Sequence, residues 1–498
     1  TGERDPISVL DRQARAQLGV SFEAYYRTTL TPDRAVSVSV LPDGTAPPTT
    51  APLDEPGAWI PVVATLGAAA PGAAEVLEVV EPAAFDRAFR TRLANGLQVV
   101  VMPHGELPIV EARLLVDADP GEGRGGDLVP VVALALSKKA WTLAESYGCA
   151  QSPALVWREK VSFRERGPTA RLPEMLDRLA CWTRRSLDGD RVDHLREAAG
   201  KAGPSAGLSP SATAWAALRS AIYSPDGELL EGARLHAVQP SSAERWLREQ
   251  LRPERSLLVL AGKVSPTPEL LAQLERRFAA WKAFGPAPRE HAPPALPARR
   301  RVVLVDVPGA ERVTLGVAAR LPRRAEADEA ATLALAQVLS LRLRAAAGPA
   351  SDVFMNVGGL AHAPFLSAWA TVSAKHAPNA ITAALDSLRE VSAEPLGSVD
   401  ANLVRWLVAR WQSFRFDTVG GRSEGVEQLF FADLPLDAWE RLPASIAALT
   451  PERIRAAAQA TAVGREVVVV QGDAATLAPA LRDAGLSPEV LPAPQPAR

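Results

Sequence analysis

Residues 93–103 read Leu-Ala-Asn-Gly-Leu-Gln-Val-Val-Val-Met-Pro, and residues 108–117 read Pro-Ile-Val-Glu-Ala-Arg-Leu-Leu-Val-Asp. The short apolar run Leu97–Met102 predicts a buried strand. A glycine-rich turn, Gly121–Gly126, leads into the apolar segment Gly126–Leu136, which predicts a helix. Strands and helices that alternate in this way indicate a mixed α and β fold.

The same pattern returns about 200 residues later. The run that begins at Val110 has a counterpart that begins at Val313, 203 residues further on. Two apolar strands, Leu257–Val264 and Glu466–Asp473, carry a glycine at equivalent positions, 210 residues apart, and a helical segment follows each. A repeat of this length indicates a duplicated domain and not a solenoid of short units.

Helices and further strands fill both halves. The apolar positions of Leu172–Ser186 and Asp328–Arg344 recur every three or four residues, which predicts amphipathic helices. Val302–Val305 predicts a strand, and Val156–Phe163 predicts one half-exposed strand because apolar and charged residues alternate. The fold class that we predict is α+β, with two homologous halves, each built of α/β sandwich subdomains. Serine or threonine N-caps are expected at the helices within Gln239–Trp246 and Leu449–Ala456.

The predicted domains follow from these patterns. Residues 1–84 form an N-terminal extension of unknown role, with a helical stretch and a short strand before a Pro/Thr-rich loop. Residues 85–284 form the first half, residues 285–298 a Pro-rich linker, and residues 299–490 the second half. For the basic triplet Arg299–Arg301, which opens the second half, a solvated strand edge is favoured over a binding patch.

Composition limits the partners. The 498 residues include 55 basic and 57 acidic side chains, a net charge of −2, so nothing favours nucleic acid or an anionic membrane surface. The most apolar stretch, Val62–Val80, is interrupted by Pro71 and Glu75, so no transmembrane span is expected. A chain that starts at Thr1 favours an exported protein, periplasmic or attached to the envelope, over a cytoplasmic one.

Two cysteines, Cys149 and Cys181, are too few for a disulfide framework. Two buried thiols are the favoured interpretation. One disulfide that joins a strand end to the following helix is the alternative. A metal site made of these two isolated cysteines is disfavoured, because structural zinc needs four ligands.

In their order and spacing these elements resemble the insulinase and mitochondrial processing peptidase family, the pitrilysin-type inverted zincins. The resemblance runs from Phe89 to about Leu486, and it rests on four motifs. These are Leu93-x-Asn-Gly-Leu-x-Val, the helix and strand in Gln239–Gly262, Val305-Asp-Val-Pro-Gly-Ala, and the closing Val467-Val-Val-Val-Gln-Gly-Asp. The family implies a clam-shell of two homologous α+β halves that encloses a chamber for peptides.

The family's zinc motif is missing. Its members carry H-x-x-E-H on the helix after the glycine-rich turn, where two histidines bind zinc and the glutamate acts as general base. The matching positions here are Val129, Val132 and Ala133, and none can bind a metal or move a proton. Glu197 lies near the third ligand position, and no two of the six histidines are closer than fourteen residues. We therefore expect no metal, no cofactor and no catalytic residue.

A second family feature is half lost. Active members grip the substrate backbone with an arginine and a tyrosine, spaced as Arg, Gly four later, and Tyr three beyond. This chain has Arg344 and Gly348, but Ser351 replaces the tyrosine, and no tyrosine follows Tyr223. Arg344 is either a residual substrate contact or a helix-terminal arginine that interacts with the helix dipole.

Glycine pairs and aromatic residues complete the candidates. Gly358-Gly359 and Gly420-Gly421 are interpreted as loop residues, because no P-loop arrangement surrounds them. The aromatic residues between 406 and 431 favour core packing over a subunit interface. They are Trp406, Trp411, Phe414, Phe416, Phe430 and Phe431.

The favoured function is a non-catalytic subunit. It would pair with an active zinc-peptidase relative that carries H-x-x-E-H, as a heterodimer or larger complex, and complete a chamber that binds peptides. The alternative is a scaffold or binding protein unconnected to proteolysis, like the family-related core subunits of respiratory complexes. A peptidase with unrecognised catalytic residues comes last, because no Gly-x-Ser-x-Gly elbow is present.

Overall fold

The structure is a computed structural model in which the chain divides into two compact units, Thr1–Ile60 and Pro61–Arg498. All residues described below lie in the second unit. They are 85, 88–118, 154–157, 160–183, 210–223, 249–285, 295–348, 351–360, 362–413 and 415–491. The predictions for residues 1–84 and for the helix start in Gln239–Trp246 therefore lie outside the described residues.

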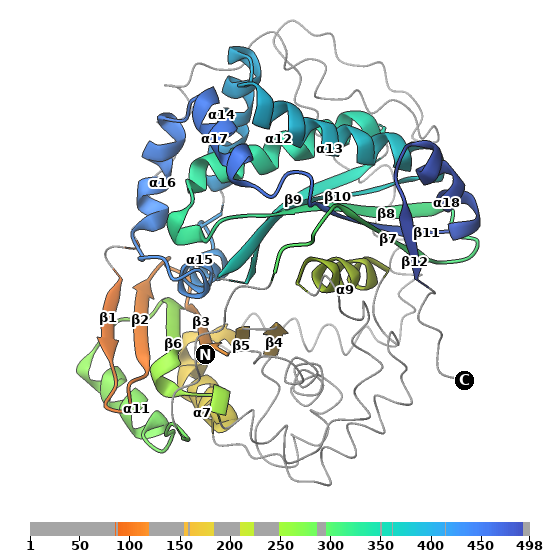
Figure 1. Cartoon of the computed structure of the whole chain (residues 1–498). Coiled ribbons are helices and arrows are strands. Elements are labelled where there is room, and N and C mark those ends of the chain that lie inside the picture. The colour runs from red at the N-terminus through yellow and green to blue at the C-terminus, as the bar shows by residue number, and fades with distance from the viewer. Residues whose placement is uncertain are drawn as a thin grey trace, which may run out of the picture. The chain divides into compact units, whose positions relative to one another are not determined.

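Two six-stranded mixed sheets organise the described chain (Figure 1). Sheet A has the order β1-β2-β6-β3-β5-β4. Its strands are β1 (Phe89–Arg92), β2 (Gln98–Pro103), β3 (Ile109–Asp117), β4 (Ala154–Trp157), β5 (Lys160–Pro168) and β6 (Ser256–Gly262). Sheet B has the order β12-β7-β11-β8-β10-β9. Its strands are β7 (Arg301–Asp306), β8 (Arg312–Arg320), β9 (Asp352–Leu360), β10 (Ala363–Ser373), β11 (Val467–Gly472) and β12 (Pro488–Leu491).

Five strands of each sheet follow one plan, so the predicted α+β architecture of two related halves is confirmed. β2 pairs in parallel with β6 as β7 does with β11, and the next three pairings are antiparallel in both sheets. The aligned glycines also match: Gly262 faces Val110, and Gly472 packs against Val313. Only the outer strand differs, because β1 runs antiparallel to β2 whereas β12 runs parallel to β7.

Helices connect the strands. Those before residue 285 are α7 (Leu172–Thr183), α9 (Pro210–Tyr223) and α11 (Pro268–Phe278). Those after residue 295 are α12 (Glu329–Ala347), α13 (Ala377–Ala393), α14 (Ser398–Ser413), α15 (Val419–Phe431), α16 (Ala438–Ala447), α17 (Pro451–Ala460) and α18 (Ala474–Asp483). Four 3-10 turns add Thr169–Arg171, Pro253–Arg255, Arg324–Glu326 and Ala374–His376. The predicted threonine cap is confirmed at Thr450, whose side chain accepts the Arg453 N–H.

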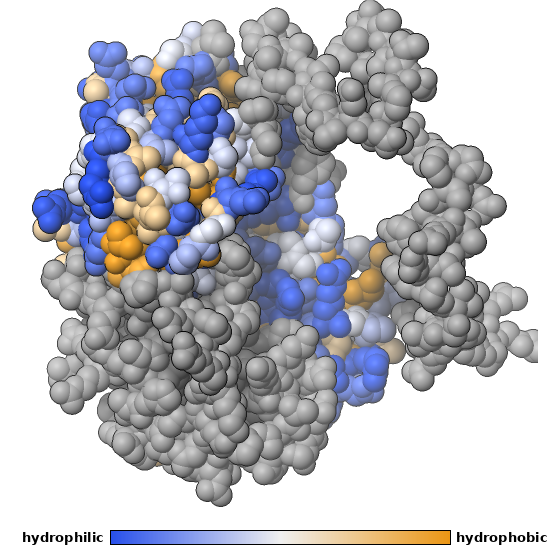
Figure 2. Space-filling view, turned by 90° about the vertical axis from the view of Figure 1, so that its right-hand side faces the viewer, coloured by the Kyte–Doolittle hydropathy of each residue, from blue (hydrophilic) through white to orange (hydrophobic). Residues whose placement is uncertain are grey.

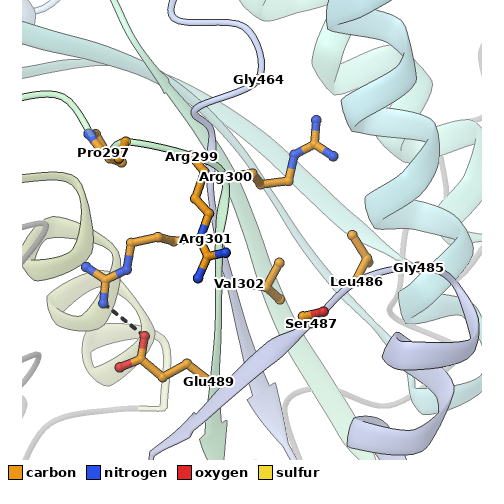
Figure 3. A pocket seen from close by; sticks show the side chains of 11 residues that line it. Pro297, Arg299, Arg300, Arg301, Val302, Gly464, Gly485, Leu486, Ser487 and Glu489 are labelled. Carbon is orange, nitrogen blue, oxygen red and sulfur yellow. Dashed lines mark hydrogen bonds and ion pairs between the residues drawn. The ribbon is translucent and has the colours of Figure 1, made fainter.

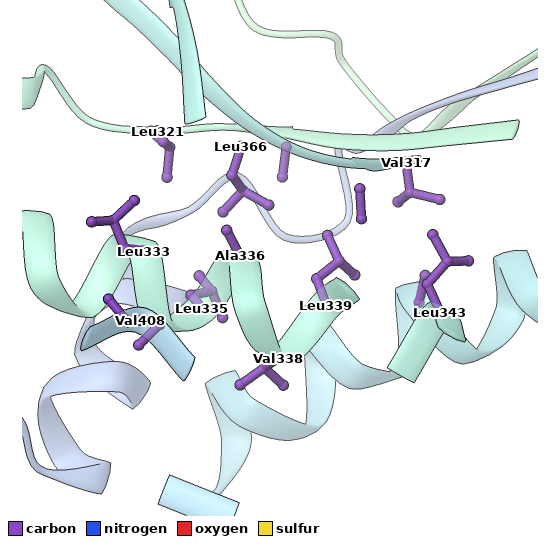
Figure 4. Packing of buried hydrophobic residues seen from close by; sticks show 14 of the residues in the cluster. Val317, Leu321, Leu333, Leu335, Ala336, Val338, Leu339, Leu343, Leu366 and Val408 are labelled. Atoms are coloured by element: carbon purple, nitrogen blue, oxygen red, sulfur yellow. The ribbon is translucent and has the colours of Figure 1, made fainter. Parts of the chain in front are cut away.

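The core of the second half surrounds α12. Figure 4 shows Leu333, Ala336 and Leu339 directed toward sheet B, while Val338 lies on the other side, toward neighbouring helices. Helices α13, α14 and α17 contact α12 on that side. Among the described helices α12 alone is long and apolar enough to cross a membrane, and 67% of its most apolar window is buried inside the protein. A helix that is apolar all round fits this central position.

The two halves exchange a helix. In sheet A, Val99 and Val101 face α7 and α11, whereas Val100 and Met102 belong to the same core as α15 of the second half. α15 contacts β3 and β6 directly. In return, α9 of the first half covers the face of sheet B that α12 leaves open, against β7, β8 and β11. Each sheet is therefore buried on one face by a helix from the other half.

Three sequence interpretations were wrong. The predicted single strand Val156–Phe163 is a hairpin, because β4 and β5 pair with Trp157 opposite Lys160. Apolar alternation continues through both strands and hides the turn. Gly358-Gly359 lies inside β9, and Gly420-Gly421 lies in the first turn of α15. At Gly359 the backbone has φ +104° and the ring of Phe365 leaves no room for a side chain, so glycine is needed within a strand.

The described surface is mainly hydrophilic on the face in Figure 2, where hydrophobic residues form small separate groups. Large apolar side chains that are substantially exposed are few among the described residues. They are Leu107, Phe284, Leu296, Phe354, Trp411 and Val490.

Candidate functional site

Val129, Val132 and Ala133, the positions predicted from the sequence to replace the zinc motif, lie outside the described residues, as does Glu197. Within the described part of the chain, no group of three or more His, Cys, Asp or Glu residues could hold a metal ion. Two of the described histidines contact other polar groups. His104 Nε2 lies 3.1 Å from the carbonyl of Asp417, and His376 Nδ1 lies 2.8 Å from the hydroxyl of Ser373.

Arg344 and Ser351 lie at the end of α12. Arg344 is in the last helical turn and donates to the backbone carbonyl of Val353 on β9, at 2.9 Å. Ser351 is buried, and its hydroxyl donates to the carbonyl of Ala347 at 2.7 Å. Ser351 thus satisfies one of the carbonyls that a helix end leaves without a partner. The Arg344 guanidinium is exposed and keeps further N–H groups for a ligand.

The arginine triplet lines a pocket of about 720 Å³. We call it the triplet pocket (Figure 3); Gly464, Gly485, Leu486 and Ser487 form other parts of its wall. Arg300 pairs at 2.9 Å with Glu466, a fully buried carboxylate, and Arg301 pairs at 2.9 Å with Glu489 on β12. Arg299 is exposed and has no partner among the described residues. Arg300 and Arg301 therefore link the start of β7 to Glu466 and Glu489. The guanidinium of Arg299 remains available to bind an anion.

A buried polar cluster lies where α15 meets sheet A. Arg113 of β3 donates to Glu111 on the same strand at 2.6 Å and to Glu427 of α15. Ser423 donates to Glu111 at 2.5 Å, and Ser162 donates to Glu427 at 3.3 Å. We call these five residues the exchange cluster, because they join the exchanged helix to its host sheet.

Charge is balanced tightly within the exchange cluster. Burial acts to lower the pKa of Arg113, but the two carboxylates and their hydrogen bonds outweigh it, so the pKa of Arg113 is raised above its ordinary value. Arg113 therefore stays charged, and its partners need that charge because both carboxylates are removed from water. None of its five residues lines the triplet pocket, and its geometry is that of a structural contact.

The aromatic residues between 406 and 431 divide between core and surface. Phe416 and Phe431 are buried, as favoured from the sequence, whereas Trp411 is 45% exposed and Phe414 lies outside the described residues. Sequence reasoning missed Arg415, which stands between these aromatic positions and contacts three rings. The only available signal was its place directly before Phe416.

The favoured interpretation of two free thiols was wrong. Cys181 on α7 is disulfide-bonded, and the chain has only one other cysteine, Cys149, which lies outside the described residues. Of the alternative, one disulfide that joins a strand end to the following helix, the described residues bear out only the helix end, Cys181 on α7. Spacing alone could not decide between the two, because the pairing depends on how close two cysteines lie in the fold.

The comparisons with known proteins agree with this architecture. Residues 237–404 match the family model described as the peptidase M16 inactive domain. This segment therefore resembles the M16 peptidases. No curated protein matches the sequence. The resemblance to the insulinase and processing peptidase family, expected from the motifs, is confirmed by this match.

Several solved structures share the fold of this chain. The peptidase M16 inactive domain from Pseudomonas fluorescens is 17% identical, with a TM-score of 0.63 over 78% of this chain and 98% of that one. The first half of the periplasmic protease PqqL from Escherichia coli is 13% identical, with a TM-score of 0.60 over 82% of this chain and 99% of that one. Against the complete PqqL, the match covers 78% of this chain but only 45% of that protein.

Proposed function

We propose that the chain is a non-catalytic subunit that pairs with an active relative carrying H-x-x-E-H and helps to form a peptide-binding chamber. The observation that carries the proposal is how much of a solved protease the fold matches. The fold matches almost all of the first half of PqqL, yet it spans less than half of the complete protein. In PqqL the matching half is one part of a longer protease. In this proposal an active relative supplies the other half of the chamber.

The lack of catalytic residues supports this assignment. Val129, Val132 and Ala133 occupy the zinc-motif positions, so hydrolysis would depend on the partner's metal. The family model that matches residues 237–404 is itself described as an inactive domain. In this proposal Arg344 remains as a contact for the substrate backbone, with its free N–H groups beside β9.

An exported location fits the same proposal. PqqL is a periplasmic protease, and the disulfide at Cys181 is the kind of bond that persists in an oxidising compartment. We therefore place the subunit in the periplasm or at the envelope.

Gentle purification of the native protein, with mass spectrometry of co-eluting chains, tests the pairing. We expect a stoichiometric partner that carries H-x-x-E-H, and one zinc ion per pair by elemental analysis. The pair should cleave a quenched fluorescent peptide, and a chelator should abolish this activity. The chain alone should contain no zinc and should cleave nothing.

Other outcomes lead to different conclusions. Stoichiometric zinc in the isolated chain would overturn the non-catalytic assignment. A partner without the motif, or no partner, would favour the scaffold function. One observation supports that function: Ser351, at the position expected for the tyrosine that grips substrate, is buried and bonds to the end of a helix.

A further inference from the structure

A second pocket, of about 230 Å³, opens beside the loop between α14 and α15. We call it the Arg415 pocket. One wall is the edge strand β9, and another is the start of α12. The residues that line it are Arg324, Glu329, Leu333, Met355, Asn356, Val357, Trp411, Arg415, Gly421, Glu424 and Gln428.

Arg415 contacts aromatic rings and has no acid partner. Its guanidinium carbon lies 4.6 Å from the ring centre of Trp411 and 4.4 Å from that of Trp439. In the part of the chain that the structure describes, its side chain makes no hydrogen bond or ion pair. Rings that stack on a guanidinium occupy its faces and leave the N–H groups, which point outward in its plane, for an acceptor.

Nearby carboxylates do not supply that acceptor. Glu329 is held by Arg324 through two hydrogen bonds, one of them 3.1 Å long. Glu424 is exposed and accepts a hydrogen bond from Gln428 at 3.2 Å. The pocket therefore has one guanidinium that forms no ion pair, and two carboxylates at its border.

The missing partner makes the charge of Arg415 costly. Burial, and then repulsion from Arg324, lower the pKa of Arg415 to about 10, and Glu329 and Glu424 offset this only in part. The pKa is lower in the folded than in the unfolded chain, so the charge disfavours folding at every pH below about 10, and stability recovers only above it. A charge kept at such a cost is typical of a binding site.

We propose that the Arg415 pocket binds a single carboxylate, with Arg415 as its anchor and Trp411 as the surface on which the rest of the ligand stacks. A carboxylate matches the forked N–H groups of arginine. A doubly charged phosphate fits less well, because Glu329 and Glu424 would repel it. The amide of Asn356 on β9 provides a second polar contact. The volume admits one acidic side chain or one chain terminus, and the site does not depend on the proposed pairing.

Calorimetric titration of the full chain with small probes tests this site. N-acetylglycine represents a chain terminus, and N-acetylglutamic acid α-amide represents an acidic side chain. N-acetylglutamine amide, which has the same shape without the charge, is the control probe. We expect one or both carboxylates to bind and to change the fluorescence of the protein, since Trp411 adjoins the site. Whichever probe binds identifies the source of the carboxylate.

Two variants assign the binding to Arg415. Arg415→Gln should weaken it about tenfold or more, and Arg415→Lys should weaken it less, because lysine keeps the charge without the fork. The matched control Arg299→Gln removes the free arginine of the triplet pocket and should leave binding unchanged. If Arg415→Gln does not fold, Arg415→Lys still decides the matter. Absence of binding at tens of millimolar, or binding that both variants retain, overturns the proposal.

Discussion

Replacement of Arg113 by alanine is expected to lower the free energy of unfolding by about 3–5 kcal/mol. The reason is that two carboxylates would stay buried: Glu111 and Glu427 would lose their shared cation while they remain excluded from water. A carboxylate in that position either keeps its charge at high cost or binds a proton. Equilibrium unfolding in urea, followed by circular dichroism, measures the loss.

Two comparisons make this test specific. Arg171→Ala removes an ion pair whose partners are both exposed, Arg171 and Glu174, and should cost less than about 1 kcal/mol. Arg113→Met combined with Glu111→Leu and Glu427→Leu removes all three charges together. That variant should recover most of the loss, because no buried charge is left without a partner. A loss below about 1 kcal/mol for Arg113→Ala would contradict the assignment of a buried cluster.

The exchange cluster also explains why the halves should unfold together. α15 buries one face of sheet A, and α9 buries one face of sheet B, so neither sheet keeps both faces covered without the other half. The polar groups of the exchange cluster hold α15 against sheet A. They find their partners in only one position of the helix along the sheet. Apolar packing against the sheet would tolerate small displacements of the helix, whereas paired charges would not.

Much of this fold could be predicted from local patterns. β2, β6, β7 and β11 are short apolar runs, and the repeat of about 200 residues gave the two related halves. The helix α12 could be predicted because its apolar residues recur at helical spacing, and the structure adds an N-cap at Asp328. Such signals are local, since each depends on residues a few positions apart.

The exchange cluster and the Arg415 pocket could not be predicted in this way. Glu111 and Ser423 are 312 positions apart, and alternation along β3 would by itself place Glu111 and Arg113 in water. They are buried because α15 covers them, and no local pattern indicates which helix covers which sheet. Arg415 likewise owes its character to Trp439 and Arg324, which other segments supply. Contacts between distant segments decide both, and only the exchange cluster depends on a helix from the other half.

The glycine at the end of each repeat strand gives the second large prediction. Gly262→Ala is expected to cost about 3 kcal/mol or more. Gly262 has φ +119°, where a side chain is strained, and an added Cβ would lie 2.2 Å from the carbonyl oxygen of Ile109. That oxygen belongs to the backbone and accepts the Lys263 N–H at 2.9 Å, so it cannot move without loss of a hydrogen bond.

Gly472→Ala is the matched control, because Gly472 ends the equivalent strand β11. Its carbonyl accepts the N–H of Val307 just as that of Gly262 accepts the N–H of His104. Gly472 is not among the residues with positive φ, and an added Cβ would meet the end of the Leu477 side chain, at 2.7 Å. A flexible side chain can turn aside, so the cost should be about 1 kcal/mol. Equal losses for the two variants in urea unfolding would contradict this account. A difference of about 2 kcal/mol would show that the duplicated strands meet different steric demands at the same position.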